Sequence, residues 1–573
     1  MKTQQQVEHE VNLLIDAYAG RRIDRRSMMK GILAAGGAAG LAMALPRLVV
    51  GQATPEASAV AAYDGPLADE QVMRIPAGEP VTMDPGVSYG DSELVVLFNI
   101  FEGLTGIDQK TGEVVPRMAE SWETNEDGSE FTFKIRENVM WSDGTPINAT
   151  DFVESWRRVL DPNTLSEYIP ALYPILNAEA IANGEMELAD LGAEAVDDLT
   201  LKVTLEGSTP YFPLLATTWT YNPVPRHVIE SAGEQWVEAE NIVTSGPYKM
   251  VEWNHDQNIV LEVNENYYGE KPVLTRGEMT IFEDASTQSY IAFENDELDY
   301  AAPEGADLDR VLADPAAMEN VVQFSLSNCN FIVIDTRDEY GSQKEFRQAL
   351  YKSIDRDTLT GTVLKGQYDS AFTVLPPDIA GYNPDAALTE SDEEAVQLLA
   401  DAGIDPAAVN LELTYQNSPA RVGIVSEYLQ NRWQEALGIT VTLAPIESNT
   451  YIDWRASRET QPYMAYTGSW GSDFGDPSNW HNQNFTSQAD HYRNHWVNEE
   501  FDALCAEAAR NTDEAEREEQ YKQAEAILVE EAPIIPVYRT KAFRAVKPWV
   551  KDLYLQPILS VVHFRNVKIA PRD

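Results

Sequence analysis

Apolar and polar residues alternate along some segments of the chain and recur at helical spacing along others. The segment 130–139, EFTFKIRENV, alternates with a period of two, which predicts a half-buried strand followed by a turn at Asp143-Gly144. The same pattern over 199–206 and 439–447 predicts two more strands. Strands and helices alternate from Val72 onward without an internal repeat, so the sequence predicts a mixed α/β fold.

Helical spacing of the apolar residues marks the second class of segment. Residues 149–160, ATDFVESWRRVL, predict a helix whose N-cap chemistry is supplied by Thr150-Asp151. A second helix is predicted over 426–437 and ends at Gly438, since glycine readily takes the left-handed conformation that terminates helices. Residues 499–533 predict two charged helices.

The length and charge of the chain limit how many lobes it can have and which partners it can bind. With 573 residues it is longer than one hydrophobic core usually supports, so two or three lobes are expected. Asp and Glu number 93 against 42 Lys and Arg, and the resulting net charge of −51 argues against binding to nucleic acid. Strong self-repulsion is best tolerated where salt screens it, so two settings stay open, a saline habitat and that of an ordinary acidic secreted protein.

The N-terminal residues are typical of an export signal. Residues 25–30, RRSMMK, resemble the twin-arginine motif, and the apolar run Gly31–Leu45 is too short to predict a membrane span. The small residues at 42–44, Ala53 and Ala59 are all candidate cleavage sites. No Cys follows the apolar run, so attachment through a lipid on an N-terminal Cys is not expected. The alternative is a soluble amphipathic N-terminus.

Residues 1–53 are thus predicted to form a twin-arginine export signal and 54–66 a flexible leader. The signal carries seven basic and four acidic residues, so the remaining chain has a net charge of −54. A twin-arginine substrate crosses the membrane already folded. We therefore expect the protein in the periplasm or at the exterior of the cell envelope, either free or held by an uncleaved signal.

Signatures of catalysis and of metal binding are absent from the sequence. It contains no Gly-x-Ser-x-Gly elbow, no Gly-rich phosphate-binding loop and no His-Glu-x-x-His, so neither enzymatic activity nor a cofactor is expected. Cys329 and Cys505 lack zinc-site spacing, and nothing in the sequence argues for a disulfide between them. His491 and His495 have the i, i+4 spacing of a helical metal site, with His481 nearby, but their polar surroundings favour surface histidines over metal ligands.

Seven sequence blocks after residue 70 occur in an order typical of one protein family. The densest is 116–164, and the others are VTMDP (81–85), NIFEGLTGID (99–108), NIVTSGPYKMVEW (241–253), FRQALYKSIDRDTL (346–359), GSWGSDFGDP (468–477) and PVYRTKAFRAVKPWV (536–550). Together they resemble the family 5 extracytoplasmic solute-binding proteins of peptide ABC importers, which include the oligopeptide- and dipeptide-binding proteins. Trp141, Trp156 and Trp253 lie in motifs that this family uses for packing, so we expect them in the core.

The resemblance implies an α/β fold of the periplasmic-binding-protein type, with two main lobes, a hinge and an extra inserted lobe. The implied parts are lobe I (67–103, 222–329 and 541–573), the extra lobe II (104–221) and the closing lobe III (330–540). Two crossings, near Cys329 and Thr540, would absorb the closure of lobe III over a ligand.

The resemblance also implies a ligand pocket around Asp473. Family members pair an Asp at this position with the α-ammonium of a peptide, and Trp470 and Gly471 match flanking positions that line the pocket. An enclosed amine loses its hydration, at a cost of several kcal/mol, unless an anion replaces the water. A structural role suits the neighbouring Asp476 better.

Further contacts follow from the same resemblance. They are the backbone-pairing segment Tyr89, Gly90 and Asp91, the aromatic Tyr168, the polar group Tyr415, Gln416 and Asn417, and the cations Arg421 and Arg458. Plain packing or a solvated loop is the alternative for these positions. The family often has an Arg where this chain has Thr467, so the carboxylate of a ligand is left to Arg458 or Arg421. Gly471 also replaces the partner with which Cys329 would form the disulfide of some members.

The resemblance implies a monomeric binding protein that captures short peptides in an extended conformation and delivers them to an ABC permease in the membrane. Energy would come from ATP hydrolysis elsewhere, not from a catalytic cycle of the protein itself. Three alternatives stay open. They are a carrier of the same fold for a nickel chelate, haem, a sugar or an opine, a secreted peptidase, and a peptide-sensing receptor without transport.

Overall fold

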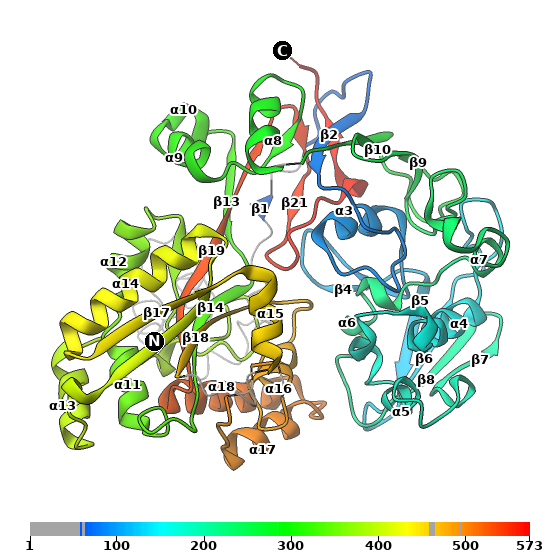
Figure 1. Ribbon diagram of the computed structural model, residues 1–573. Helices are drawn as coiled ribbons and strands as arrows, with labels where there is room; N and C mark the ends of the chain where they lie inside the picture. The colour runs from blue at the N-terminus through cyan, green and yellow to red at the C-terminus, as the bar shows by residue number, and fades with distance from the viewer. Residues whose placement is uncertain are drawn as a thin grey trace, which may run out of the picture. The chain divides into compact units, whose positions relative to one another are not determined.

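The computed structural model describes residues 58–59, 63–283, 285–457, 464–489, 491–492 and 494–572 (Figure 1). The chain divides into two units, Met1–Ala53 and Thr54–Asp573, and every element described below belongs to the second. The predicted export signal and Arg458 lie outside the described residues. Among the residues that are described, no helix combines the length and the apolar character needed to cross a membrane.

The first sheet has four strands in the order β2-β11-β10-β9. Their bounds are β2 (Val72–Ala77), β9 (Tyr248–Asn254), β10 (Asn258–Val263) and β11 (Arg276–Ile281). β2 pairs with β11 in parallel, and the other neighbours are antiparallel. Along β2 every second residue is buried, as expected for a strand with one face on the core. The helix α3 (Asp91–Ile100) packs against β9.

The second sheet is antiparallel, with four strands in the order β5-β6-β8-β7. Their bounds are β5 (Ala119–Thr124), β6 (Glu130–Ile135), β7 (Ala193–Asp197) and β8 (Thr200–Thr204). The strands predicted within 130–139 and 199–206 are therefore confirmed, and β6 shows the expected alternation of burial. The predicted turn is also present, because Gly144 has a φ of +89° and its N–H donates to the Trp141 carbonyl at 2.9 Å.

The helix α4 (Ala149–Leu160) packs on this sheet through β7 and has the bounds that its sequence predicts. The predicted cap was wrong by two residues. Asn148 is the N-cap, and its side chain accepts a hydrogen bond from the Thr150 N–H, while Asp151 accepts one from the Asn148 N–H at 2.9 Å. Asp151 thus completes a capping box from the third helical position instead of beginning the helix.

The third sheet has eight strands. The order is β12-β19-β14-β18-β16-β17, and β13 and β15 also pair with β19. The bounds are β12 (Tyr300–Ala301), β13 (Val321–Ser325), β14 (Asn328–Ile334), β15 (Tyr368–Ser370), β16 (Asn410–Gln416), β17 (Thr440–Ile446), β18 (Ala465–Gly471) and β19 (Ile534–Val546). β16 runs parallel to both β17 and β18, whereas β14 is antiparallel to β18 and to β19. The carboxyl ends of β16, β17 and β18 therefore share one edge, next to the start of β14.

Helices follow the strands of this sheet. The helix α14 (Ala420–Leu437) begins six residues before the predicted segment and ends at Gly438, whose φ of +74° matches the prediction. The two charged helices predicted within 499–533 are α17 (Glu499–Ala508) and α18 (Glu514–Glu531). The predicted strand within 439–447 is β17.

The remaining elements are shorter or peripheral (Figure 1). They are β1 (Ser58–Ala59), β3 (Thr105–Ile107), β4 (Val114–Pro116), α5 (Ala178–Ala182), α6 (Phe212–Leu215), α7 (Arg226–Ala232), α8 (Ala285–Glu294), α9 (Gly305–Ala313), α10 (Pro315–Met318), α11 (Lys344–Lys352), α12 (Arg356–Thr358), α13 (Asp392–Asp401), α15 (Ser448–Ser457), α16 (His481–Asn484), β20 (Val550–Lys551), β21 (Tyr554–Leu555) and β22 (Lys568–Ile569). In the predicted leader, β1 pairs with β21, and the Tyr63 N–H donates to Asp552 at 2.8 Å. These leader residues are thus bound to the C-terminal segment.

The cores follow the sheets. One hydrophobic cluster joins buried residues between Met73 and Tyr300 with residues near the C-terminus, and further clusters form within 329–538. Trp141, Trp156 and Trp253 are 1%, 0% and 8% exposed, which confirms their predicted place in the core. The predicted mixed α/β class is likewise confirmed.

Candidate functional site

The shared edge of the eight-stranded sheet gathers residues from three sequence segments. In open α/β sheets, ligands bind outside the carboxyl ends of the strands, where loops and helix N-termini converge. Trp470-Gly471 ends β18, and Tyr415-Gln416 ends β16. Asn417 follows β16, and Arg421 lies in the first turn of α14. Asp473 is two residues beyond the end of β18.

Asp473 is held by neutral groups. Its N–H donates to Asn479 Oδ1 at 2.9 Å, and Asn479 Nδ2 donates back to Asp473 Oδ2 at 3.1 Å. The hydroxyl of Tyr168 donates a further hydrogen bond to the carboxylate. One side-chain amide thus fixes both the backbone and the carboxylate of Asp473.

Burial raises the pKa of Asp473 above its usual range, and the hydrogen bonds from Asn479 and Tyr168 oppose this rise only in part. In the part of the chain that the structure describes, no Lys, Arg or His forms an ion pair with Asp473. The site therefore holds a partly desolvated carboxylate whose charge is not compensated by a described cation. A ligand that carries a cation would stabilise the ionised form.

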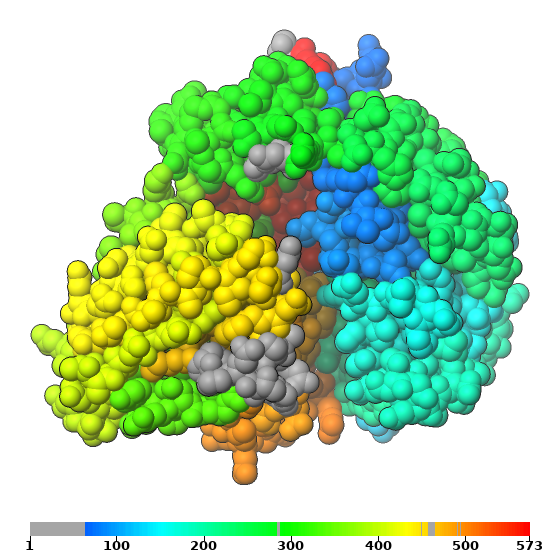
Figure 2. All heavy atoms as spheres, in the orientation of Figure 1, coloured from blue at the N-terminus to red at the C-terminus, as the bar shows by residue number. Residues whose placement is uncertain are grey.

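Tyr168 reaches Asp473 from the segment that follows α4. Its ring packs on Trp219 with centroids 4.9 Å apart, and Trp219 Nε1 donates to the Ser88 carbonyl at 2.8 Å. Trp219 in this way links Tyr168 to the segment that precedes α3. Figure 2 shows a hollow in the surface between residues of the 400–480 range, in yellow, and residues of the 90–200 range, in blue to cyan.

The predicted backbone-pairing segment leads into α3. The side chain of Tyr89 is 60% exposed, Gly90 is the N-cap of α3, and Asp91 is its exposed first residue. Gly90 has a φ of −94°, which any residue can adopt, so the backbone conformation itself does not require glycine. Contact of these residues with a ligand stays a prediction.

Arg421 lies between two tyrosine hydroxyls. Its guanidinium donates hydrogen bonds to Tyr368 in β15 and to Tyr538 in β19. Burial raises the pKa of Tyr538 to about 12, although the nearby cation opposes the rise. Arg421 Nε is buried without a hydrogen-bond partner, and no described Asp or Glu forms an ion pair with the guanidinium. Arg421 thus resembles Asp473 in one respect. Each side chain contacts neutral polar groups, and neither has an ion-pair partner among the described residues.

The other predicted residues at this edge are partly or fully covered. Tyr415 is buried, Gln416 is half-buried, and the exposed Asn417 donates its N–H to the Ile446 carbonyl at 2.8 Å. The ring of Trp470 lies 5.0 Å from that of His491, and its Nε1 is buried with no acceptor among the described residues. Contact of Trp470 with a ligand stays a prediction.

Asp476 has the structural role that the sequence suggested. Its carboxylate accepts from the Ser478 N–H and from both Nη atoms of Arg517, at 2.8 and 2.7 Å. The supporting residues Asn479, Tyr368 and Tyr538 were missed by sequence reasoning. Each is an ordinary polar side chain that becomes relevant only when the strands are paired, and no spacing in the sequence marks it.

The histidines and cysteines do not form a metal site in the part of the chain that the structure describes. The two histidines predicted at the surface, His491 and His495, are half-buried. The nearby His481 is fully buried and has its Nε2 3.0 Å from Glu525 Oε2. His491 and His495 lie outside any helix, so their i, i+4 spacing has no chelating geometry. Cys329 and Cys505 are both buried and free.

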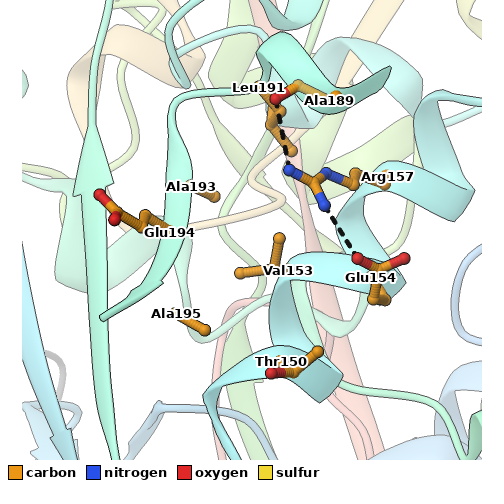
Figure 3. Close-up of a pocket in the computed structure, with 9 residues that line it drawn as sticks. All are labelled: Thr150, Val153, Glu154, Arg157, Ala189, Leu191, Ala193, Glu194 and Ala195. Atoms are coloured by element: carbon orange, nitrogen blue, oxygen red, sulfur yellow. Dashed lines mark hydrogen bonds and ion pairs between the residues drawn. The ribbon is translucent and has the colours of Figure 1, made fainter. Parts of the chain in front are cut away.

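A surface pocket of about 360 Å³ lies elsewhere, between α4 and β7 (Figure 3). It is lined by Thr150, Val153, Glu154, Arg157, Ala189, Leu191, Ala193, Glu194 and Ala195, none of which belongs to the predicted site. Arg157 in this pocket is already paired with Glu154 at 2.8 Å and donates to the Leu188 carbonyl. The guanidinium in this pocket is therefore already paired with a carboxylate of the same pocket.

The fold and this edge define a ligand-binding α/β protein, and comparison with known proteins gives its family. Residues 113–492 match the family described as bacterial extracellular solute-binding proteins, family 5, middle region. The match spans more than half of the chain, so the chain belongs to this family.

Two relatives and one solved structure show how far the likeness extends. The probable deoxycholate-binding periplasmic protein YgiS of Escherichia coli is 31% identical over 88% of this chain and 94% of that protein. The periplasmic oligopeptide-binding protein OppA of Salmonella typhimurium is 31% identical over 90% of this chain and 96% of that protein. The crystal structure of Haemophilus influenzae OppA in complex with RPPGFSPFR covers 88% of this chain and 100% of that one, with a TM-score of 0.70 and 28% identity.

Proposed function

We propose that the protein is the extracytoplasmic peptide-binding component of an ABC importer, which captures short peptides and delivers them to a membrane permease. Family membership supports a role in solute binding. The relatives named for oligopeptide binding, and a neighbouring structure that contains a bound peptide, support a peptide as the solute. The protein needs no catalytic cycle of its own for this role and acts as a monomer.

One observation carries the choice of ligand. Asp473 and Arg421 lie at the same edge of one sheet, each held by neutral hydrogen-bonding groups and each without an ion-pair partner among the described residues. A peptide carries an ammonium at one end and a carboxylate at the other, so it supplies the missing opposite charge to both. Charge-assisted hydrogen bonds at both ends are about twice as strong as neutral ones.

The remaining predicted contacts complete the proposed pocket. Trp470 and Gly471 flank the ammonium end, and Tyr168 supports Asp473 from the opposite side. The segment Tyr89, Gly90 and Asp91, the group Tyr415, Gln416 and Asn417, and Arg458 are proposed to contact the middle and far parts of the peptide. Backbone pairing with an extended ligand would make affinity largely independent of peptide sequence.

The three sheets support the proposed lobes. All strands of the first sheet fall in the proposed lobe I, and all strands of the second fall in lobe II. In the third sheet, β15 to β18 fall in lobe III and β12 and β13 fall in lobe I. β14 runs from lobe I into lobe III past Cys329, and β19 runs from lobe III into lobe I past Thr540. The two proposed crossings, near Cys329 and Thr540, are joined by hydrogen bonds. The Leu326 N–H donates to the Thr540 carbonyl, and the Thr540 N–H donates to Asn328 Oδ1, both at 2.9 Å. We propose hinge motion at this point and export by the twin-arginine pathway.

A non-peptide ligand is the second candidate, because one relative is named as probably deoxycholate-binding. An amphipathic carboxylate of that kind would use Arg421 but would bring no cation to Asp473. The two candidates therefore differ in their need for Asp473.

Calorimetric titration of the chain from residue 54 tests the proposal with two ligands, a random di- to pentapeptide pool and deoxycholate. Peptide binding that weakens by 2–5 kcal/mol in Asp473→Asn supports the proposal. Asp385→Asn, an exposed Asp in the short turn Pro384–Ala386, serves as the control and is expected to leave affinity unchanged. Absence of peptide binding, or peptide binding that Asp473→Asn leaves unchanged, overturns the peptide assignment and leaves the family unchanged.

A further inference from the structure

One acid, Asp84, holds the turn that leads towards α3. The Asp84 carbonyl accepts hydrogen bonds from the N–H groups of Val87 and Ser88, at 3.1 and 3.0 Å, and from Ser88 Oγ at 2.7 Å. The Asp84 carboxylate accepts from the Gly86 N–H at 2.9 Å. Three consecutive N–H groups thus bind a single residue, which is itself only 4% exposed. The turn 84–88 is therefore fixed as one unit.

Arg158, in the last turn of α4, binds Asp84 from outside this turn. Arg158 Nη1 donates to Asp84 Oδ1 at 3.1 Å, and Nη2 donates to Oδ2. Two parallel bonds between a guanidinium and a carboxylate fix the orientation of both groups, which a single ammonium could not do. The turn also lies close against α4, because a Cβ added at Gly86 would be 3.2 Å from both Arg158 Nη1 and Val159 Cγ2. The helix α4 thereby sets the position of the turn.

Tyr89 comes directly after this fixed turn. Ser88 is 1% exposed, whereas Tyr89 is 60% exposed. The Ser88 carbonyl accepts from Trp219 Nε1 at 2.8 Å, and the Gly90 carbonyl accepts from the Leu94 N–H at 3.1 Å. Between these two satisfied carbonyls, the N–H and the carbonyl of Tyr89 form no hydrogen bond with any described residue. Tyr89 therefore offers one backbone donor and one backbone acceptor, the set that a residue of an extended peptide pairs with.

Trp219 joins the same turn to a second residue of the proposed pocket. Its Nε1 binds the Ser88 carbonyl, and its ring packs on that of Tyr168 with centroids 4.9 Å apart. Trp219 is 2% exposed, so water does not compete for either contact. The backbone of Tyr89 thus lies one residue away from a buried bridge to Tyr168, in the part of the molecule where the ligand is proposed to bind.

From these contacts we infer that Arg158 and Asp84 are positioning residues of the ligand site. Together they hold the backbone of Tyr89 where its N–H donates to a carbonyl of an extended ligand and its carbonyl accepts from a ligand N–H. Neither Arg158 nor Asp84 touches the ligand. They raise affinity because a backbone that is already ordered loses less conformational entropy on binding. The inference rests on the proposed function, since it needs a ligand with peptide groups, and it names the residue that binds them.

The test is calorimetric titration with one tripeptide and with the two analogues in which an ester replaces one of its amide groups. An ester keeps the carbonyl but has no N–H to donate to Tyr89, so we expect wild-type protein to bind one analogue about tenfold more weakly than the tripeptide. Arg158→Gln should raise the Kd of the tripeptide about tenfold and distinguish it from that analogue by less than threefold. The double variant Asp84→Asn/Arg158→Gln, which leaves no buried charge without a partner, should be no weaker than the single one.

Arg157→Gln is the matched control, because Arg157 is the neighbouring arginine of α4 and pairs with Glu154 instead. It should change neither the Kd of the tripeptide nor the preference for the amide. Weaker binding by the Arg158 variants with the wild-type preference intact would overturn the inference, and so would a lower unfolding temperature with every Kd unchanged. If wild-type protein binds the tripeptide and both analogues equally, pairing at Tyr89 fails and the proposed function stands. If it binds none of them, both fail.

Discussion

The hydroxyl of Tyr168 donates a hydrogen bond to the carboxylate of Asp473, although the two residues are far apart in the sequence. Tyr168 follows the helix of the antiparallel four-stranded sheet, and Asp473 follows a strand of the eight-stranded sheet. A second contact beside it stacks Tyr211 on Phe474 with centroids 6.4 Å apart. The part of the chain that carries the antiparallel four-stranded sheet thus contributes directly to the surroundings of the proposed ligand acid.

Tyr168→Phe should shift the pH dependence of peptide binding. The Tyr168 hydrogen bond favours the ionised carboxylate, so its loss raises the pKa of Asp473 further. Affinity falls as pH drops through this pKa, because a protonated Asp473 no longer attracts an ammonium. We expect the acid limb of the plot of Kd against pH to move to higher pH in the variant, with little change at pH 7.5. An unmoved acid limb would contradict the proposed link between Tyr168 and Asp473.

Asp473→Asn should stabilise the unliganded protein at neutral pH. A carboxyl whose pKa is raised by folding binds more protons in the folded than in the unfolded chain, so its contribution to stability is lost as pH rises above the usual Asp range. Removing the charge is expected to increase the free energy of unfolding at pH 7.5 by about 1 kcal/mol. The gain should vanish near pH 3, where Asp473 is protonated in both states. Denaturant unfolding at the two pH values measures the difference, and a less stable variant at pH 7.5 would show that Asp473 is already compensated.

Arg421→Gln tests the opposite end of the proposed ligand. The guanidinium held by Tyr368 and Tyr538 should bind the terminal carboxylate of a peptide, so the variant is expected to lose 10- to 100-fold in affinity for free acids. Peptides with an amidated C-terminus should be affected far less. Arg432→Gln on the same helix, where Arg432 pairs with Asp392 at 2.6 Å, is the matched control and should change neither affinity. Equal losses for acids and amides would assign Arg421 a structural role.

The excess of acid predicts that stability depends on salt. With a net charge of −51, repulsion among surface carboxylates favours the unfolded chain, and potassium chloride screens it over distances that shrink from about 10 Å at 0.1 M to 3 Å at 1 M. We expect the unfolding temperature to rise by several degrees between 0.1 and 2 M, a stabilisation of about 2 kcal/mol. A flat or falling unfolding temperature would favour an ordinary acidic secreted protein.

Much of the fold could be predicted because local patterns coincide with it. The strand at 130–135, the helix at 149–160 and the glycine that ends α14 all follow from spacing and propensity. The cap at Asn148 was missed because an acid three residues later, Asp151, carries an equally good local signal. No local pattern could show the burial of His481, because it depends on Glu525 in a helix that follows some forty residues later.

The residues of the candidate site also fall into those that the sequence predicts and those that it does not. Asp473 and Arg421 were predicted from the family resemblance, and the strand order then explains why two segments separated along the chain end at one edge. The groups that hold them could not be found in this way. Asn479, Tyr368 and Tyr538 act through contacts that arise only after the strands pair, and each is a common residue type in an ordinary sequence context.

The central claim, that Asp473 receives the ammonium of a peptide, is tested most directly by one calorimetric comparison. A tripeptide and its N-acetylated form are titrated into wild-type protein and into Asp473→Asn at pH 7.5. We expect wild type to prefer the free amine by 2–5 kcal/mol and the variant to bind the two forms with nearly equal, weak affinity. Equal affinity of wild type for both forms, or an undiminished preference in Asp473→Asn, would contradict the claim.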